Sequence, residues 1–203
     1  KIKVFYSPNT TYSLKIKEKS IQEIFPSLKN QKYFLLVSGN RWIKNNARAI
    51  YALDELYNSN DLIDFKVVLT GVNEIPPFFK KIKNRNNFLF LNYVSNNELS
   101  CLYKYCYSFI YPSLNEGFGY PPIEAMFYGK PVLASPLTSI TEVCGEAALY
   151  FNPLSIEEIK NRILMILDAD IYTEKVNKSI TQYEVIKKRQ VEDLDKLVNY
   201  ITS

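Results

Sequence analysis

Short apolar runs alternate with helical patterns along most of this chain. Runs that predict buried strands lie at 33–37, 65–69, 88–91, 109–111, 132–134 and 148–151. Because these runs are apolar at nearly every position, they indicate strands covered on both faces. Apolar residues at helical spacing separate them, as in 45–57, and a last helical stretch begins near residue 171. A short helix is expected at 77–82.

Helix ends carry signals of their own. Capping-box spacing, a serine followed three residues later by glutamate, occurs at Ser95/Glu98, Ser139/Glu142 and Ser155/Glu158. Pro121 predicts the start of the helix after the fourth strand, and Gly129 predicts its end. Along the last helical stretch the apolar faces are expected to carry Val176, Ile180, Tyr183, Leu194, Leu197 and Ile201.

Strands and helices in this alternation predict the α/β class. We expect a Rossmann-like, doubly wound parallel sheet of about six strands with helices on both faces. Such sheets bind ligands beyond the carboxyl ends of their strands. Four of the six glycines, Gly39, Gly71, Gly117 and Gly119, fall on that predicted rim.

Composition narrows the setting of the protein. The 203 residues are 47% apolar, which predicts a packed core, and the net charge of +4 is too mild to argue for nucleic acid. No apolar run reaches the length of a membrane span, and the first ten residues do not form a secretory signal. Three cysteines, Cys101, Cys106 and Cys144, lack metal-ligand spacing, and their odd number indicates reduced thiols in the cytoplasm.

The chain contains no histidine. This excludes a Ser-His-Asp hydrolase, a histidine-ligated metal site and a histidine general base within it. Carboxylates, Lys, Arg, Tyr, Cys and backbone dipoles remain as the groups that carry its chemistry.

The most informative segment is 112–126, which links the fourth strand to a helix. Its two glycines let the backbone approach a ligand, and a helix start suits a diphosphate. Glu116 and Glu124 bracket the loop with seven residues between them. A carboxylate accepts two hydroxyl hydrogen bonds at once, as from a ribose or hexose diol. The helix dipole alone favours a glutamate such as Glu124 near a helix start, but it explains Glu116 less well.

The segment 116–126 resembles the Glu-x7-Glu signature of retaining glycosyltransferase family 4 (group 1), which has the GT-B fold of two Rossmann-like lobes. The resemblance covers about residues 33–168. It includes 111–113 before the signature and, after it, 129–132, Glu142-Val143, 145–147 and 151–153. Upstream, 91–95 with Glu98-Leu99 resembles the segment near the nucleobase.

The resemblance implies a site for a UDP- or GDP-sugar in the C-terminal, donor-binding lobe. It implies that Glu116 and the amides of Gly117, Phe118 and Gly119 hold the donor sugar, and that Glu124 holds the ribose. Arg41 and Lys44 are expected to neutralise the diphosphate, so that the catalytic set is Glu116, Arg41 and Lys44 with no metal and no cofactor. The donor-binding set is completed by Gly39, Asn40, Tyr93, Val94 and Tyr120.

Other features are interpreted as structural. Trp42 is expected to pack the loop after the first strand, with sugar stacking as the alternative. Cys101 and Cys106 are expected to act as small apolar residues in the helix after the third strand. The basic cluster of Lys80, Lys81, Lys83 and Arg85 is interpreted as a solvated face.

The chain departs from the family in showing one lobe. We expect 1–32, whose first eight residues resemble the segment that enters the second lobe, to lead into a donor-binding domain at 33–168. The helices of 169–203 are expected to pack on this domain or on the missing lobe. The missing N-terminal lobe would bind the acceptor, a glycan or lipid-linked sugar. The chain is therefore expected to be a truncated chain or one half of a split enzyme, inactive alone.

The expected function is transfer of a hexose with retention in polysaccharide or glycoconjugate synthesis. The expected location is the cytoplasm, with peripheral association of the whole enzyme at the inner face of the membrane. Two alternatives remain open: a non-catalytic module that binds nucleotide sugars, and half of a GT-B-fold epimerase. A dinucleotide-dependent oxidoreductase is disfavoured, because no G-x-G-x-x-G opens the first helix.

Overall fold

Six parallel strands form the centre of the protein in the computed structural model, which describes residues 20–202. The strands are β1 (Lys32–Leu36), β2 (Phe65–Leu69), β3 (Phe88–Phe90), β4 (Ser108–Tyr111), β5 (Val132–Ala134) and β6 (Ala148–Tyr150). Their spatial order is β3-β2-β1-β4-β5-β6, and every neighbouring pair is parallel. The predicted fold class, a doubly wound Rossmann-like sheet, is confirmed.

Helices connect the strands in the alternation that the sequence predicted. The α-helices are α1 (Ile21–Ile24), α2 (Asn46–Asn58), α3 (Asn96–Tyr105), α4 (Tyr120–Phe127), α5 (Ile140–Cys144), α6 (Ile156–Met165) and α7 (Ala169–Thr202). Short 3₁₀ turns are η1 (Pro26–Leu28), η2 (Trp42–Lys44), η3 (Pro77–Lys81), η4 (Arg85–Asn87) and η5 (Gly145–Ala147). The expectation for the first eight residues lies outside the described part.

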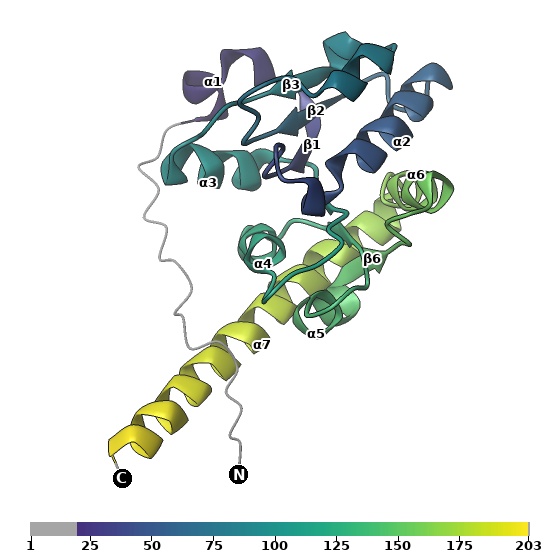
Figure 1. The fold of residues 1–203 in the computed structure, drawn as a ribbon. Coiled ribbons are helices and arrows are strands. Elements are labelled where there is room, and N and C mark those ends of the chain that lie inside the picture. The colour runs from purple at the N-terminus through teal and green to yellow at the C-terminus, as the bar shows by residue number, and fades with distance from the viewer. Residues whose placement is uncertain (1–19, 203) are drawn as a thin grey trace.

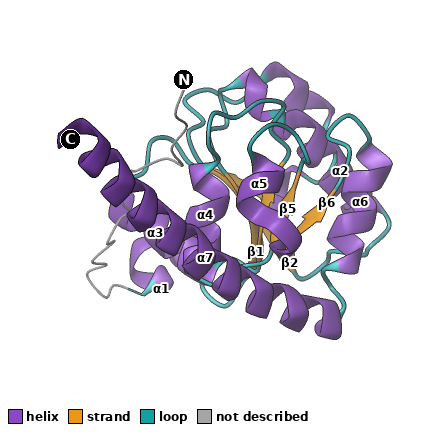
Figure 2. Cartoon of the chain, turned by 90° about the horizontal axis from the view of Figure 1, so that it is seen from below, coloured by secondary structure: helices purple, strands orange, loops and turns teal. Residues whose placement is uncertain are grey.

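The sheet separates two apolar cores, because successive side chains of a strand point to opposite faces. On β1, Tyr33 and Leu35 belong to the core under α3, α4, α5 and part of α7. Phe34 and Leu36 belong to the core under α2 and α6. Helices thus cover both faces of the sheet, as Figure 2 shows. The three cysteines form no disulfide and are buried in the first core.

The long helix α7 packs on α4, α5 and η5. Tyr183 and Ile186 are its buried apolar contacts, whereas Ile180 and Ile201, which were expected on its apolar faces, are 50% and 72% exposed. The last turns project beyond the body of the protein (Figure 1). Among the described helices, none is both long and apolar enough to cross a membrane.

The capping signals were right at two helices and wrong at a third. The Ser95 and Ser155 side chains accept hydrogen bonds from the backbone N–H groups of Glu98 and Glu158, as predicted. Ser139 precedes α5 in a helical conformation and makes no capping bond. Its hydroxyl donates instead to the backbone carbonyl of Glu116, so a contact distant in sequence replaces the local cap.

Candidate functional site

The site lies where the strand order reverses, between β1 and β4. At such a point the loops after two neighbouring strands diverge and leave a crevice for a ligand. Lys44, at the end of η2 after β1, donates hydrogen bonds to the Tyr111 hydroxyl and to Glu116 Oε1, both at 2.6 Å. The ion pair is almost fully enclosed, since the Lys44 and Glu116 side chains are 6% and 11% exposed.

Hydrogen bonds favour the ionised form of Glu116. Burial alone would raise the pKa of Glu116, but hydrogen bonds from Lys44, Ser113 and Tyr111 outweigh it and hold that pKa below the usual value. The pKa of Tyr111 is raised by burial and by the hydrogen bond and charge of Glu116. The Lys44 ammonium also lies 4.9 Å from the Tyr111 ring centroid, within range of a cation–π contact.

Hydrogen bonds from neighbouring loops hold the Glu116 turn in place. Its N–H donates to Thr138 Oγ1 at 3.1 Å, and its carbonyl accepts from the Ser139 hydroxyl at 3.3 Å. The Ser113 hydroxyl donates to Oε1 of the same residue. Lys44 and Ser113 thus share one carboxylate oxygen, and the other, Oε2, receives a hydrogen bond from neither.

The start of α4 offers fewer amide donors than a typical helix. The helix begins at Tyr120, one residue before the predicted Pro121, and Gly119 caps it with a φ of 103°. Pro121 and Pro122 have no backbone N–H, so among the first three residues of the helix only Tyr120 carries one. The amide donors of this region are therefore those of the glycine loop rather than of the helix interior.

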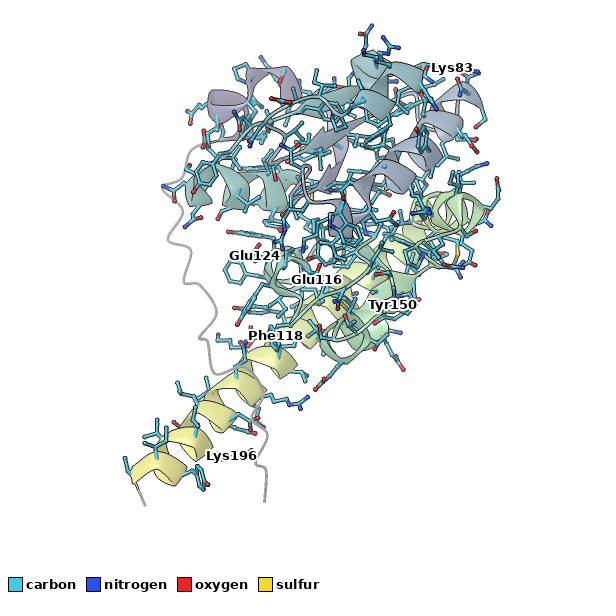
Figure 3. All side chains as sticks on the ribbon, viewed as in Figure 1. Lys83, Glu116, Phe118, Glu124, Tyr150 and Lys196 are labelled. Carbon is cyan, nitrogen blue, oxygen red and sulfur yellow. The ribbon has the colours of Figure 1, made fainter. Side chains whose placement is uncertain are left out.

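Glu124 lies on α4, and its pKa is raised by burial and partly restored by the hydroxyl of Tyr103. Tyr103 is buried, and its hydroxyl has no hydrogen-bond partner of normal geometry among the described residues. Both Glu116 and Glu124 raise the pKa of Tyr111 through their charge, so both carboxylates lie in the neighbourhood of this tyrosine. Figure 3 shows both beside α4, far from the labelled Lys83 and Lys196.

The loop after β1 supplies further expected residues. Gly39 is half-buried and donates its N–H to Thr70, and a Cβ there would clash with the Val72 side chain, so only glycine fits. Asn40 and Arg41 are exposed. Arg41 lies outside the Lys44–Glu116 pair, but it is near enough for its positive charge to lower the pKa of Tyr111.

The remaining expected residues surround the pair at greater distance. Gly117 is exposed, and the Phe118 and Tyr120 rings lie 4.9 Å apart between centroids. Tyr93 and Val94 lie between β3 and α3, at the edge of the sheet, with Tyr93 largely exposed. The structure thus brings Lys44, Glu116 and Glu124 together around Tyr111 and leaves Tyr93 and Val94 two strands away.

Two findings differ from the sequence interpretation. Trp42 was expected to pack its loop, but it is 81% exposed, because η2 directs Lys44 inward and Trp42 outward. Tyr111 and Tyr103 were not recognised as site residues. Tyr111 stood at the end of a strand and within the resembling segment 111–113, but neither signal gave it a role. Tyr103 gave no signal, because both roles depend on contacts between distant segments.

Within residues 20–202, no three His, Cys, Asp or Glu side chains form a group able to hold a metal ion. The chemistry available on the described residues is that of a paired cation and carboxylate, a second carboxylate and a loop of amides. This set suits a ligand that carries both negative charge and hydroxyl groups.

Comparisons with known proteins point to glycosyltransferases. The model of "Glycosyl transferases group 1" matches residues 17–183. The O-antigen chain mannosyltransferase RfbU of Salmonella typhimurium is 28% identical over 165 residues, covering 79% of this chain and 46% of that protein. The serotype-specific mannosyltransferase WbdA of Escherichia coli is 37% identical over 100 residues, covering 49% and 12%.

The fold comparison agrees. The crystal structure of Anabaena Alr3699/HepE in complex with UDP and glucose has a TM-score of 0.75 at 17% identity. The match covers 98% of this chain and 55% of that one. The chain thus spans about half or less of the length of these relatives.

Proposed function

The chain belongs to the glycosyl transferases group 1 family, and from this premise we propose that it is the C-terminal, donor-binding lobe of a retaining, metal-independent hexosyltransferase of family 4. The substrate is a nucleotide diphospho-sugar. The names of the mannosyltransferase relatives favour a mannosyl donor and a role in O-antigen-type polysaccharide synthesis. The acceptor glycan binds with the help of a second lobe.

The observation that carries the proposal is the enclosed Lys44–Glu116 pair at the reversal of strand order. An ammonium group has three N–H donors, and the two hydrogen bonds of Lys44 leave one for a phosphate oxygen. Positive charge at this place stabilises the charge that grows on the diphosphate as the sugar–phosphate bond breaks. Arg41, on the same loop, adds a second cation.

The carboxylates then have separate tasks. Glu116 Oε2 accepts a hydroxyl of the donor sugar, while the other oxygen stays bonded to Lys44 and Ser113. Glu124, which is half-buried and forms no salt bridge with any described lysine or arginine, accepts the ribose hydroxyls. A nucleoside diphosphate and a hexose would thus contact different glutamates of one site.

Isosteric variants test this division. Glu124→Gln removes the charge that strengthens the ribose hydrogen bonds, so we expect affinity for UDP or GDP to fall about tenfold. Glu116→Gln should leave the affinity for the free nucleotide within about twofold and abolish the extra affinity that the sugar provides. Calorimetric titration with UDP, GDP and their mannose and glucose conjugates measures both. Equal losses for the free nucleotide in the two variants would contradict the assignment.

A further inference from the structure

A second hollow opens on the other side of the loop that carries Lys44. The loop after β1 contacts β4 residues through Lys44, but toward β2 it borders a cleft of about 660 Å³. One wall of the cleft is formed by residues 39–42 and 45–47, and the other by residues 73–78 of the loop after β2. Neither Glu116 nor Glu124 lines it.

Two large apolar side chains stand exposed at this cleft. Trp42 is 81% exposed and Ile75 is 65% exposed, one on each wall. Single exposed apolar residues are common on protein surfaces. Two of them facing one concave site are less easily explained by chance, because each keeps apolar surface in water that a ligand would cover.

The polar lining indicates the kind of ligand. Asn40 and Asn73, one on each wall, are exposed, and each amide offers both donors and an acceptor. The cleft carries one acidic side chain, Glu74, and one basic side chain, Arg41, which the proposed function already assigns to the donor diphosphate. A phosphate-bearing ligand would find no net positive charge here, and a lipid tail would find too many polar groups.

A hexose meets these conditions. One face of a pyranose ring is made of C–H groups that pack on the flat face of an indole by dispersion. Its hydroxyls are both donors and acceptors, as the amides of asparagine are. We propose that this cleft is a subsite for a neutral oligosaccharide, in which Trp42 stacks on one sugar ring and Asn40 and Asn73 bond its hydroxyls. That this oligosaccharide is the acceptor glycan rests on the proposed function; the binding itself does not.

Trp42 provides the test, because it is the only tryptophan in the chain. We expect mannotriose or maltotriose, titrated to millimolar concentrations, to shift its emission to shorter wavelength in a saturable way as water leaves the indole. UDP and GDP should not displace the sugar. An emission spectrum unchanged by both oligosaccharides would overturn the proposal.

Variants separate the cleft from general effects on the surface. Asn73→Ala and Ile75→Ser keep the reporter and should weaken the oligosaccharide about three- to tenfold. Ile63→Ser removes an isoleucine that is 71% exposed but lies outside the cleft, and it should change nothing. Trp42→Ala should lower the affinity for the oligosaccharide at least about tenfold, and Trp42→Tyr should retain part of that affinity. Because both variants lack the fluorescent reporter, saturation-transfer NMR that detects the ligand measures their binding.

Two outcomes distinguish failure of the subsite from failure of the proposed function. Glu124→Gln should weaken the nucleotide and leave the oligosaccharide unaffected. Oligosaccharide binding without any nucleotide binding would remove the proposed function and keep the subsite. Nucleotide binding with no oligosaccharide binding would rule out the subsite. A shift of the Trp42 emission that depends only on protein concentration would also rule it out, because it would show that this face contacts a second copy of the chain.

Discussion

At the scale of single residues, Tyr111 helps to fix the position of the Lys44 ammonium group in the site. Its hydroxyl accepts from Lys44 at 2.6 Å and its ring lies beneath the ammonium group. Tyr111→Phe keeps the ring and removes the hydroxyl, so the ammonium loses one of its two anchors. We expect the affinity for a nucleoside diphosphate to fall about three- to tenfold, with the weak affinity for the nucleoside unchanged. Calorimetric titration of both ligands measures the difference.

Tyr150→Phe is the matched control for this prediction. The Tyr150 hydroxyl also makes one hydrogen bond, to the Gly145 carbonyl at 2.7 Å, and it is not bonded to Lys44 or Glu116. Both variants should lose about 1 kcal/mol of unfolding free energy. A similar loss of diphosphate affinity in the two would show that Tyr111 acts only through stability.

The ionised side chain of Glu124 is expected to lower the free energy of unfolding of the ligand-free protein. Burial raises its folded-state pKa above that of the unfolded chain, so the ionised side chain destabilises the fold above the usual glutamate pKa, about 4.3. Glu124→Gln should therefore raise the melting temperature at pH 7, by roughly 2–4 °C for each kcal/mol relieved. This gain in melting temperature should disappear as the pH falls below the pKa of glutamate in the unfolded chain, because Glu124 is then protonated in both states.

Nucleotide binding should show the opposite dependence on pH. The ribose hydroxyls donate to an ionised carboxylate, so wild-type affinity should decline as pH falls through the raised pKa of Glu124. The glutamine variant should bind weakly at every pH. Melting curves and titrations across the same pH series measure both effects, and a pH-independent wild-type affinity would contradict this account.

The sequence alone shows that two glutamates bracket one loop and helix start, but it does not show how their side chains are held. Glu116 and Glu124 are joined by a short spacing that a single loop and helix explain. The Lys44–Tyr111 contact joins residues 67 positions apart, so it depends on the placement of β1 beside β4. The direction of Trp42 was mispredicted for the same reason. Lys44 lies on the same short turn and points inward to Tyr111, which leaves Trp42 pointing outward.

At the scale of elements, α7 contains a matched pair of glutamines. Gln190 is buried, and neither side-chain polar atom has a hydrogen-bond partner in the described part of the chain. Gln182 donates to the Val143 carbonyl at 2.7 Å. Gln190→Leu should stabilise the fold by about 1 kcal/mol, and Gln182→Leu should destabilise it by a similar amount. Thermal melts of the two variants give the comparison, and two shifts of the same sign would refute it.

The strands were easier to predict than the helix ends. β2 and β5 lie at the predicted positions, because a strand buried on both faces must be apolar throughout. The cap at Ser139 failed, because its hydroxyl bonds the Glu116 carbonyl instead of its own helix. A capping signal shows what a serine is able to do, and tertiary contacts decide whether it does so.

At the scale of the whole molecule, alternation predicts a parallel sheet but does not by itself fix the strand order. The order β3-β2-β1-β4-β5-β6 places the loops after β1 and β4 at its reversal, and so determines which of the expected residues meet. Tyr93 and Val94 follow the edge strand β3, and only a ligand long enough to span β2 and β1 would reach both them and Glu116. A nucleotide sugar, with a base at one end and a hexose at the other, has this extended shape.

The open side of the site leads to the last prediction. Arg41 and Gly117 are exposed beside an enclosed Lys44–Glu116 pair, so the described residues would hold a donor from one side only. Transfer also needs an acceptor hydroxyl held in line with the sugar and shielded from water. We expect the 203-residue chain to be stabilised thermally by its nucleotide sugar and to transfer no hexose to a mannose oligosaccharide. Product analysis after incubation with donor and acceptor tests this, with a full-length relative as the positive control; turnover by the chain alone would show that its own residues suffice for the reaction.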